Sequence, residues 1–263
     1  MGWAELRAEL DAWYAAGRTA TLWWRDDGAA DWTPALYRLV QIARAGSVPL
    51  ALAVPPMAAT PRLATRLAEW PRVRVLQHGY ALRNHAPAHE APSEYPALRN
   101  GTAVAGEICH GWLRISELFG KRALPVFVPP WTRMSAGLPA TLALLGFNGI
   151  SSLGQRASPA EDTGLAAVNV HVEVTTGWEH PGFAGAERVL DGMTAHLRAR
   201  RAGAADPDEP TGLLSRHGEL DGAAWAFLER LVAATANHPA VRFPAPEVIF
   251  TRPDAPARMP ASA

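Results

Sequence analysis

Short apolar runs alternate with longer amphipathic stretches along this 263-residue chain, and this alternation constrains its fold more than any other feature. The runs predicted to be strands are 20–25, 49–54, 73–77, 124–128, 149–152, 167–172 and 212–215. The stretches predicted to be helices are 33–45, 61–70, 103–119, 138–145, 184–201 and 221–236. Such alternation is typical of repeated βα units around a parallel sheet. It predicts an α/β fold, a distorted (β/α) barrel of seven strands, with a doubly wound open sheet as the alternative.

The whole chain, 1–263, is predicted to be a single domain. Its length suits one large α/β domain, and hydrophobic residues make up 48% of it, which is enough for a sizeable core. We expect that core over about 19–250. The polar stretch 202–210 is predicted to be a loop, with a domain linker as the alternative. The Pro- and Ala-rich tail 252–263 is predicted to be disordered.

Charge and composition limit the classes of partner. Lys and Arg number 25, as do Asp and Glu, so the formal net charge is zero. A balanced charge gives no reason to expect nucleic acid or an anionic membrane as partner. One cysteine, Cys109, allows neither an internal disulfide nor a thiolate metal cluster, and we expect it to be a packing residue. Charged residues interrupt 1–17, so the sequence predicts no signal peptide and a cytoplasmic location.

Polar and aromatic residues collect just after the predicted strands, where ligands bind in parallel α/β folds. The residues in these positions include Asp26, Asp27, His78, Tyr80, Trp131, Arg133, Glu173 and His217. Two adjacent carboxylates would repel each other unless a cation held one and left the other to act as a base. The alternative for Asp26 and Asp27 is a helix cap with a solvated neighbour.

Histidines supply the other candidate ligands and acids. His78 follows a predicted strand and precedes a glycine, with His85 seven residues further on. Imidazole is the commonest metal ligand, so Asp and His together at strand ends are a candidate site for zinc or another divalent metal. His217 is placed like a general acid, although a histidine that merely caps the last strand is the alternative.

Five motifs, taken in their order along the chain, resemble those of the NodB-like polysaccharide deacetylase family. The motifs are LWWRDDG (22–28), QHGYALRNH (77–85), VPPWTR (128–133), HVEVTTGW (171–178) and LLSRH (213–217). The resemblance implies that Asp26 is the general base and His217 the general acid. It also implies that Asp27 and His78 hold a divalent metal, expected to be zinc, that activates water. The residues that we expect near the substrate are Trp131, Arg133, Trp178 and Tyr80, since aromatic faces stack well on sugar rings.

Two departures from the family pattern affect the predicted activity. Leu82 stands where the second histidine of the motif should be, and leucine cannot bind a metal. Catalytic zinc usually has three protein ligands, so His85 is a further candidate for the missing one. The arginine that usually opens the proline motif is also absent, and Arg133 could supply its charge from the other side.

The sequence thus predicts a metal-dependent hydrolase that removes an acyl group from an N-acylated sugar or related amide, with a small-molecule or glycan substrate. One alternative is a catalytically impaired protein that binds a carbohydrate. Another is a hydrolase with a rearranged site that acts on a different amide.

Overall fold

The computed structural model describes residues 2–156, 163–176 and 182–251, and nine strands in these ranges form one parallel sheet. Their order is β6-β5-β4-β3-β2-β1-β8-β7, and β9 pairs with β1. The strands are β1 (Ala20–Asp27), β2 (Leu50–Val54), β3 (Val73–His78), β4 (Ala123–Val128), β5 (Gly149–Ile150), β6 (Ala166–Ala167), β7 (Val172–Glu173), β8 (Thr211–Ser215) and β9 (Val241–Arg242).

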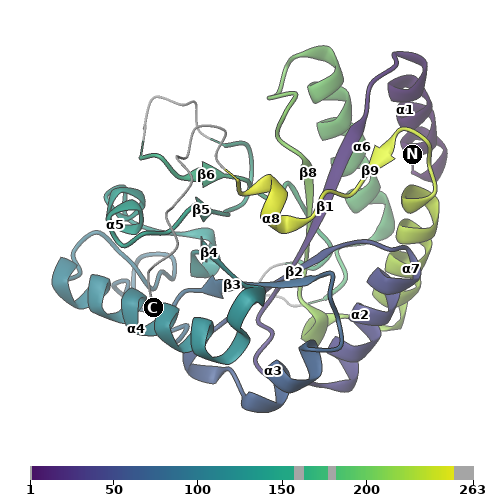
Figure 1. Cartoon of the computed structure of the whole chain (residues 1–263). Coiled ribbons are helices and arrows are strands. Elements are labelled where there is room, and N and C mark those ends of the chain that lie inside the picture. The colour runs from purple at the N-terminus through teal and green to yellow at the C-terminus, as the bar shows by residue number, and fades with distance from the viewer. Residues whose placement is uncertain (1, 157–162, 177–181, 252–263) are drawn as a thin grey trace.

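The two ends of this sheet are neighbours in the chain, which curls the sheet into a distorted barrel (Figure 1). Only 168–171 separates β6 from β7, and a bridge joins Leu153 to Val170 within that gap. The predicted distorted (β/α) barrel is therefore confirmed, with nine strands in the described ranges in place of the seven expected. The strand expected at 167–172 is two short strands instead, because its two ends pair with opposite edges of the sheet.

Side-chain alternation along the strands separates two layers of core. Trp23 of β1 points into the barrel, where it packs with Leu76, Val128 and Leu214. Its neighbour Trp24 belongs to the larger core between the sheet and the helices. Residues two positions apart on β1 therefore point to the same face of the sheet. By this alternation Asp27 points to the same side as Trp23, and Asp26 to the same side as Trp24.

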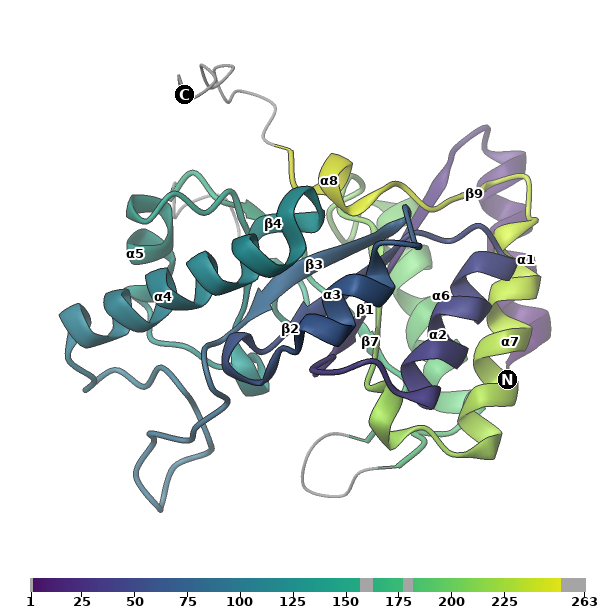
Figure 2. The same cartoon turned by 60° about the horizontal axis from the view of Figure 1, so that its bottom comes forward.

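The helices flank the sheet on its outer side, as Figure 2 shows for α2, α3, α4 and α7. They are α1 (Trp3–Ala15), α2 (Pro34–Ala45), α3 (Pro61–Leu67), α4 (Gly101–Phe119), α5 (Leu138–Leu144), α6 (Ala186–Ala202), α7 (Gly222–Ala236) and α8 (Pro246–Ile249). The side chains of Thr33, Thr60, Asn100 and Asp221 accept hydrogen bonds from backbone N–H groups in the first turns of α2, α3, α4 and α7. Across the ranges that the structure covers, no helix is long and apolar enough to span a membrane.

Helix α1 was not predicted from the sequence, although it belongs to the core. Leu6, Leu10 and Trp13 are buried on its inner face, and the Trp13 Nε1–H donates to the carbonyl of Leu197 in α6. The spacing of these three residues is that of a helix face. Exposed charged residues between them interrupt the apolar pattern along the sequence.

The expectation that Cys109 is a packing residue is wrong. Cys109 is exposed on α4, whose buried face is formed by Val104, Ile108, Gly111, Ile115 and Phe119. These residues recur every three to four positions, and Cys109 falls just off that stripe. The tail 252–263, predicted to be disordered, lies outside the described residues.

Candidate active site

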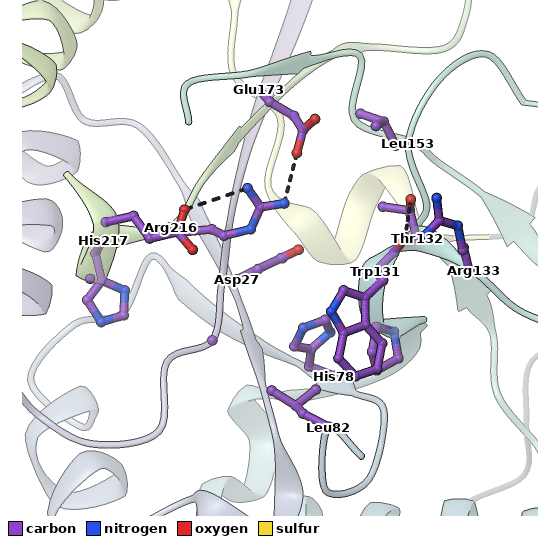
Figure 3. A pocket seen from close by; sticks show the side chains of 14 residues that line it. Asp27, His78, Leu82, Trp131, Thr132, Arg133, Leu153, Glu173, Arg216 and His217 are labelled. Atoms are coloured by element: carbon purple, nitrogen blue, oxygen red, sulfur yellow. Dashed lines mark hydrogen bonds and ion pairs between the residues drawn. The ribbon is translucent and has the colours of Figure 1, made fainter. Parts of the chain in front are cut away.

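A pocket of about 510 Å³ opens at the carboxyl ends of the strands (Figure 3). Its lining residues are Asp27, Gly28, His78, Leu82, Pro130, Trp131, Thr132, Arg133, Leu153, Glu173, Arg216, His217, Gly218 and Glu219. Its volume is typical of a site for a small molecule, for which the range is roughly 300–1,000 Å³. The structure thus brings Asp27, His78 and His217 together from β1, β3 and the turn after β8.

The two adjacent aspartates point to opposite faces of the sheet. Strand β1 runs on to Asp27, two residues beyond its predicted end at Arg25, so both aspartates lie within the strand. Asp27 lines the pocket, whereas Asp26 is 0% exposed and does not line it. Strand alternation is the physical cause, because successive side chains leave a strand on opposite sides.

Asp26 is fully engaged by groups at the end of β8. Its Oδ2 accepts hydrogen bonds from the hydroxyl of Ser215 at 2.6 Å and from the backbone N–H of His217 at 2.9 Å. Its Oδ1 lies 2.5 Å from Nδ1 of His217. Asp26 therefore contacts the predicted general acid directly, instead of facing it across a substrate.

This contact controls the charge of His217. Burial lowers the pKa of the imidazole, but the charge of Asp26 and its hydrogen bond outweigh burial, so the pKa is raised above its ordinary value. Nδ1 donates to the carboxylate of Asp26, which can only accept, and the ring lines the pocket. An oriented imidazolium of this kind can donate a proton to a group bound in the pocket.

Asp27 is held by a buried arginine that the sequence analysis did not select. Arg25 donates from Nε to Oδ1 of Asp27 at 2.8 Å and from Nη2 to Oδ2 at 3.1 Å. Its Nη1 donates across the barrel to the carbonyl and hydroxyl of Ser151, at 3.0 and 2.5 Å. Arg25 is 0% exposed, so the pair is a charge-assisted fork inside the barrel. In the sequence, the feature that indicates a buried charge here is an arginine directly after the apolar run LWW.

His78 presents a neutral ring to the pocket. Its Nδ1 lies 3.2 Å from the carbonyl oxygen of Val128, which can only accept, so Nδ1 carries the proton and Nε2 is the unprotonated nitrogen. Burial lowers the pKa of His78; the charge of Asp27 opposes this shift and that of Arg25 adds to it. The geometry suits an acceptor or a metal ligand.

The side chains present do not form a set that fits a catalytic metal. Both oxygens of Asp27 already accept from Arg25, and Leu82 contributes only carbon to the pocket. His85 is exposed and does not line the pocket. Over 2–156, 163–176 and 182–251, no group of three or more His, Cys, Asp and Glu side chains is placed to hold a metal ion.

A second residue missed from the sequence is Glu94, which shapes the loop after β3. Its buried carboxylate accepts hydrogen bonds from the backbone N–H groups of Tyr80, Ala81 and Arg83, at 3.0, 2.8 and 3.2 Å. Tyr80 itself, predicted to contact substrate, does not line the pocket, and its hydroxyl lies 3.0 Å from Nδ1 of His110. No local motif marked Glu94, because its partners lie 11–14 residues away.

The proline motif, 128–133, forms a further part of the pocket rim. Trp131 and Arg133 line the pocket as predicted substrate contacts would, and the backbone of Trp131 and Thr132 is left-handed, with φ of 53° and 58°. Such a conformation is uncommon for residues other than glycine and costs energy. Trp178, the remaining predicted contact, lies outside the described residues.

Arg216 is a further pocket residue, which was not predicted from the sequence. Its guanidinium donates to Oε1 of Glu173 and to the hydroxyl of Thr175, both at 2.8 Å, and lies 4.0 Å from Glu219. Burial lowers the pKa of Arg216, but its hydrogen bond to Glu173 and the charges of Asp27, Glu173 and Glu219 raise it more. Arg216 therefore remains a fixed cation on the wall of the pocket (Figure 3).

The comparisons identify the fold. No family model and no curated protein matches the sequence. Among solved structures, a candidate polysaccharide deacetylase from Mycobacterium smegmatis shares 16% identity with a TM-score of 0.60, over 89% of this chain and 90% of that one. The chain has the polysaccharide deacetylase fold.

Two further structures with the polysaccharide deacetylase fold are also similar. A peptidoglycan N-acetylglucosamine deacetylase shares 11% identity with a TM-score of 0.54, over 90% of this chain and 95% of that one. A mutant of a CE4 family pseudoenzyme with restored enzymatic activity shares 12% identity with a TM-score of 0.51, over 89% of this chain and 68% of that one. At these identities the likeness concerns the fold, and function has to be argued from the site.

Proposed function

We propose that this protein binds an N-acylated sugar or a related small amide in the strand-end pocket, and that its hydrolytic centre is impaired at the metal position. The observation that carries the proposal is the buried fork between Arg25 and Asp27. A divalent cation at Asp27 would have to displace a guanidinium that neutralises the carboxylate and is anchored on Ser151. Of the other two positions that the family pattern gives to the metal, only His78 could bind it, because Leu82 stands in the third place.

The pocket walls support a sugar-like ligand. The indole of Trp131 offers an aromatic face, which stacks well on the C–H face of a sugar ring. Glu173, Arg216 and Glu219 offer charged donors and acceptors for hydroxyl groups. The CE4 pseudoenzyme among the similar structures is a precedent for a protein of this fold that lacks activity and regains it by mutation.

The hydrolase predicted from the sequence is the second candidate, and the pairing of Asp26 with His217 favours it. A buried aspartate that orients and charges an imidazole is the arrangement expected of a general acid for a leaving amine. Zinc or another divalent metal would have to supply the activated water, and the fork at Asp27 opposes its binding.

Two measurements on the purified chain separate the candidates. Calorimetric titration with N-acetylglucosamine and its short β-1,4 oligomers reports binding, and an acetate-release assay with and without added Zn²⁺ or Co²⁺ reports hydrolysis. We expect saturable binding that Trp131→Ala weakens at least tenfold, without metal-dependent acetate release. Turnover on added metal would favour the hydrolase, whereas neither binding nor release would reject both candidates.

A further inference from the structure

Backbone strain in this chain is concentrated at the pocket. Within the described ranges, the non-glycine residues with left-handed backbone are Ser47, Leu82, Trp131 and Thr132. All of these except Ser47 line the pocket. Strained residues persist where the surrounding structure fixes them, and an observed cluster of them points to function.

Leu82 is held in this conformation from both sides. Its φ is 54°, and the N–H groups of its neighbours Ala81 and Arg83 both donate to the buried carboxylate of Glu94. Leucine is a poor residue for this backbone, since Asn, Asp, His and Gly adopt it more readily. The leucine side chain is therefore presented to the pocket at a conformational cost.

The strained residues build one wall of the pocket. Figure 3 shows Leu82 and the indole of Trp131 beside His78, while Arg216 and Glu173 lie on the other side. Pro130, the residue before Trp131, also lines the cavity. We call the wall of Leu82, Pro130 and Trp131 the apolar wall.

We propose that the apolar wall receives an acyl chain longer than acetyl, so that the preferred ligand is an N-acyl amino sugar with a chain of about four to six carbons. This inference rests on the proposed function and specifies its ligand. The hydroxyl groups of the sugar need hydrogen-bond partners, which Glu173, Arg216 and Glu219 offer. The acyl chain has no such need, and Leu82 presents carbon to the pocket beside His78.

The test is the dependence of affinity on chain length. N-acetyl-, N-butanoyl- and N-hexanoylglucosamine are titrated into the full chain by calorimetry. Each buried methylene strengthens binding by up to about fourfold, so we expect the Kd to fall at least about tenfold from N-acetyl to N-hexanoyl. Equal Kd values for the three ligands would overturn the acyl-chain inference and leave the proposed function standing. The absence of binding by any of them would reject the proposed function itself.

A matched pair of variants assigns the effect to Leu82. Leu82→Asn keeps a residue that tolerates φ of 54° and removes the apolar contact, so the variant should fold and its affinities should no longer depend on chain length. Leu113→Asn, at a leucine that is 58% exposed on α4, should retain the wild-type dependence. A Leu82→Asn variant that folds and still favours N-hexanoyl by tenfold would overturn the role given to Leu82.

Discussion

Nδ1 of His217 lies 2.5 Å from Oδ1 of Asp26, a contact between residues 191 positions apart that fixes the orientation and the charge of the imidazole. Asp26 is fully buried, is hydrogen-bonded to His217 and Ser215, and does not line the pocket, so we propose that it acts through His217. The resemblance assigned Asp26 the part of a base that takes a proton from water. The contacts of Asp26 favour a positioning role instead.

Asp26→Asn should lower the pKa of His217, because the opposing charge that raises it is removed. A histidine with a raised pKa stabilises the fold fully below its unfolded-state pKa of about 6.5, and this stability is lost as pH rises through the folded-state pKa. The variant should therefore lose about 3 kcal/mol near pH 6, and less at pH 9. Histidine NMR titration and urea unfolding at both pH values measure the two effects. An unchanged His217 pKa in the variant would contradict the assignment.

Arg25→Ala should destabilise the fold by roughly 3–5 kcal/mol, since it leaves the Asp27 carboxylate buried without its partner. The double variant Arg25→Ala/Asp27→Ala should lose less than the single variant, because no unpaired charge remains. Arg38→Ala removes an exposed ion pair with Glu229 and serves as the control, with an expected loss below about 1 kcal/mol. Urea unfolding of the three variants gives the comparison, and equal losses for Arg25→Ala and Arg38→Ala would refute it.

Gly79→Ala should disrupt the loop that carries Leu82. Gly79 has φ of 55°, and a Cβ there would lie 2.1 Å from Oε2 of Glu94 and 2.4 Å from Cγ of Pro130. Strain and overlap together predict a loss of about 3 kcal/mol in the free energy of unfolding. Gly106→Ala is the matched control within α4, where an added Cβ would meet no atom outside the local helix backbone within 4 Å, and it should gain about 0.5–1 kcal/mol. If Gly79→Ala leaves the free energy of unfolding unchanged, the loop is not held by these contacts.

A buried histidine pair at the other end of the barrel predicts acid sensitivity. The rings of His171 and His196 stack with centroids 3.6 Å apart. Burial, followed by the charges of His171 and Arg200, lowers the pKa of His196 to about 3. Stability should therefore fall as pH drops from about 6.5 towards 3, by up to ~1.4 kcal/mol per pH unit from this group. His196→Gln should flatten the acid side of a plot of urea midpoint against pH, and identical slopes in variant and wild type would contradict the prediction.

The strand pattern was predictable because apolar runs and their polar ends are local features of the sequence. Roles that depend on distant partners could not be predicted in this way. Arg25, Glu94 and Arg216 acquire their roles from partners distant in sequence, and charged residues are ordinarily read as solvated. The opposite directions of Asp26 and Asp27 follow from strand alternation, but only once β1 is known to run on to Asp27.

The most direct test of the central claim is the metal content of the purified chain after equilibration with micromolar Zn²⁺ and dialysis. The fork between Arg25 and Asp27, together with Leu82, predicts far less than one equivalent for the wild type. The double variant Arg25→Met/Leu82→His frees the carboxylate and adds a third ligand, so it should retain close to one equivalent. A wild type that holds one zinc ion per chain and loses it in Asp27→Asn would contradict the claim that the metal position is impaired.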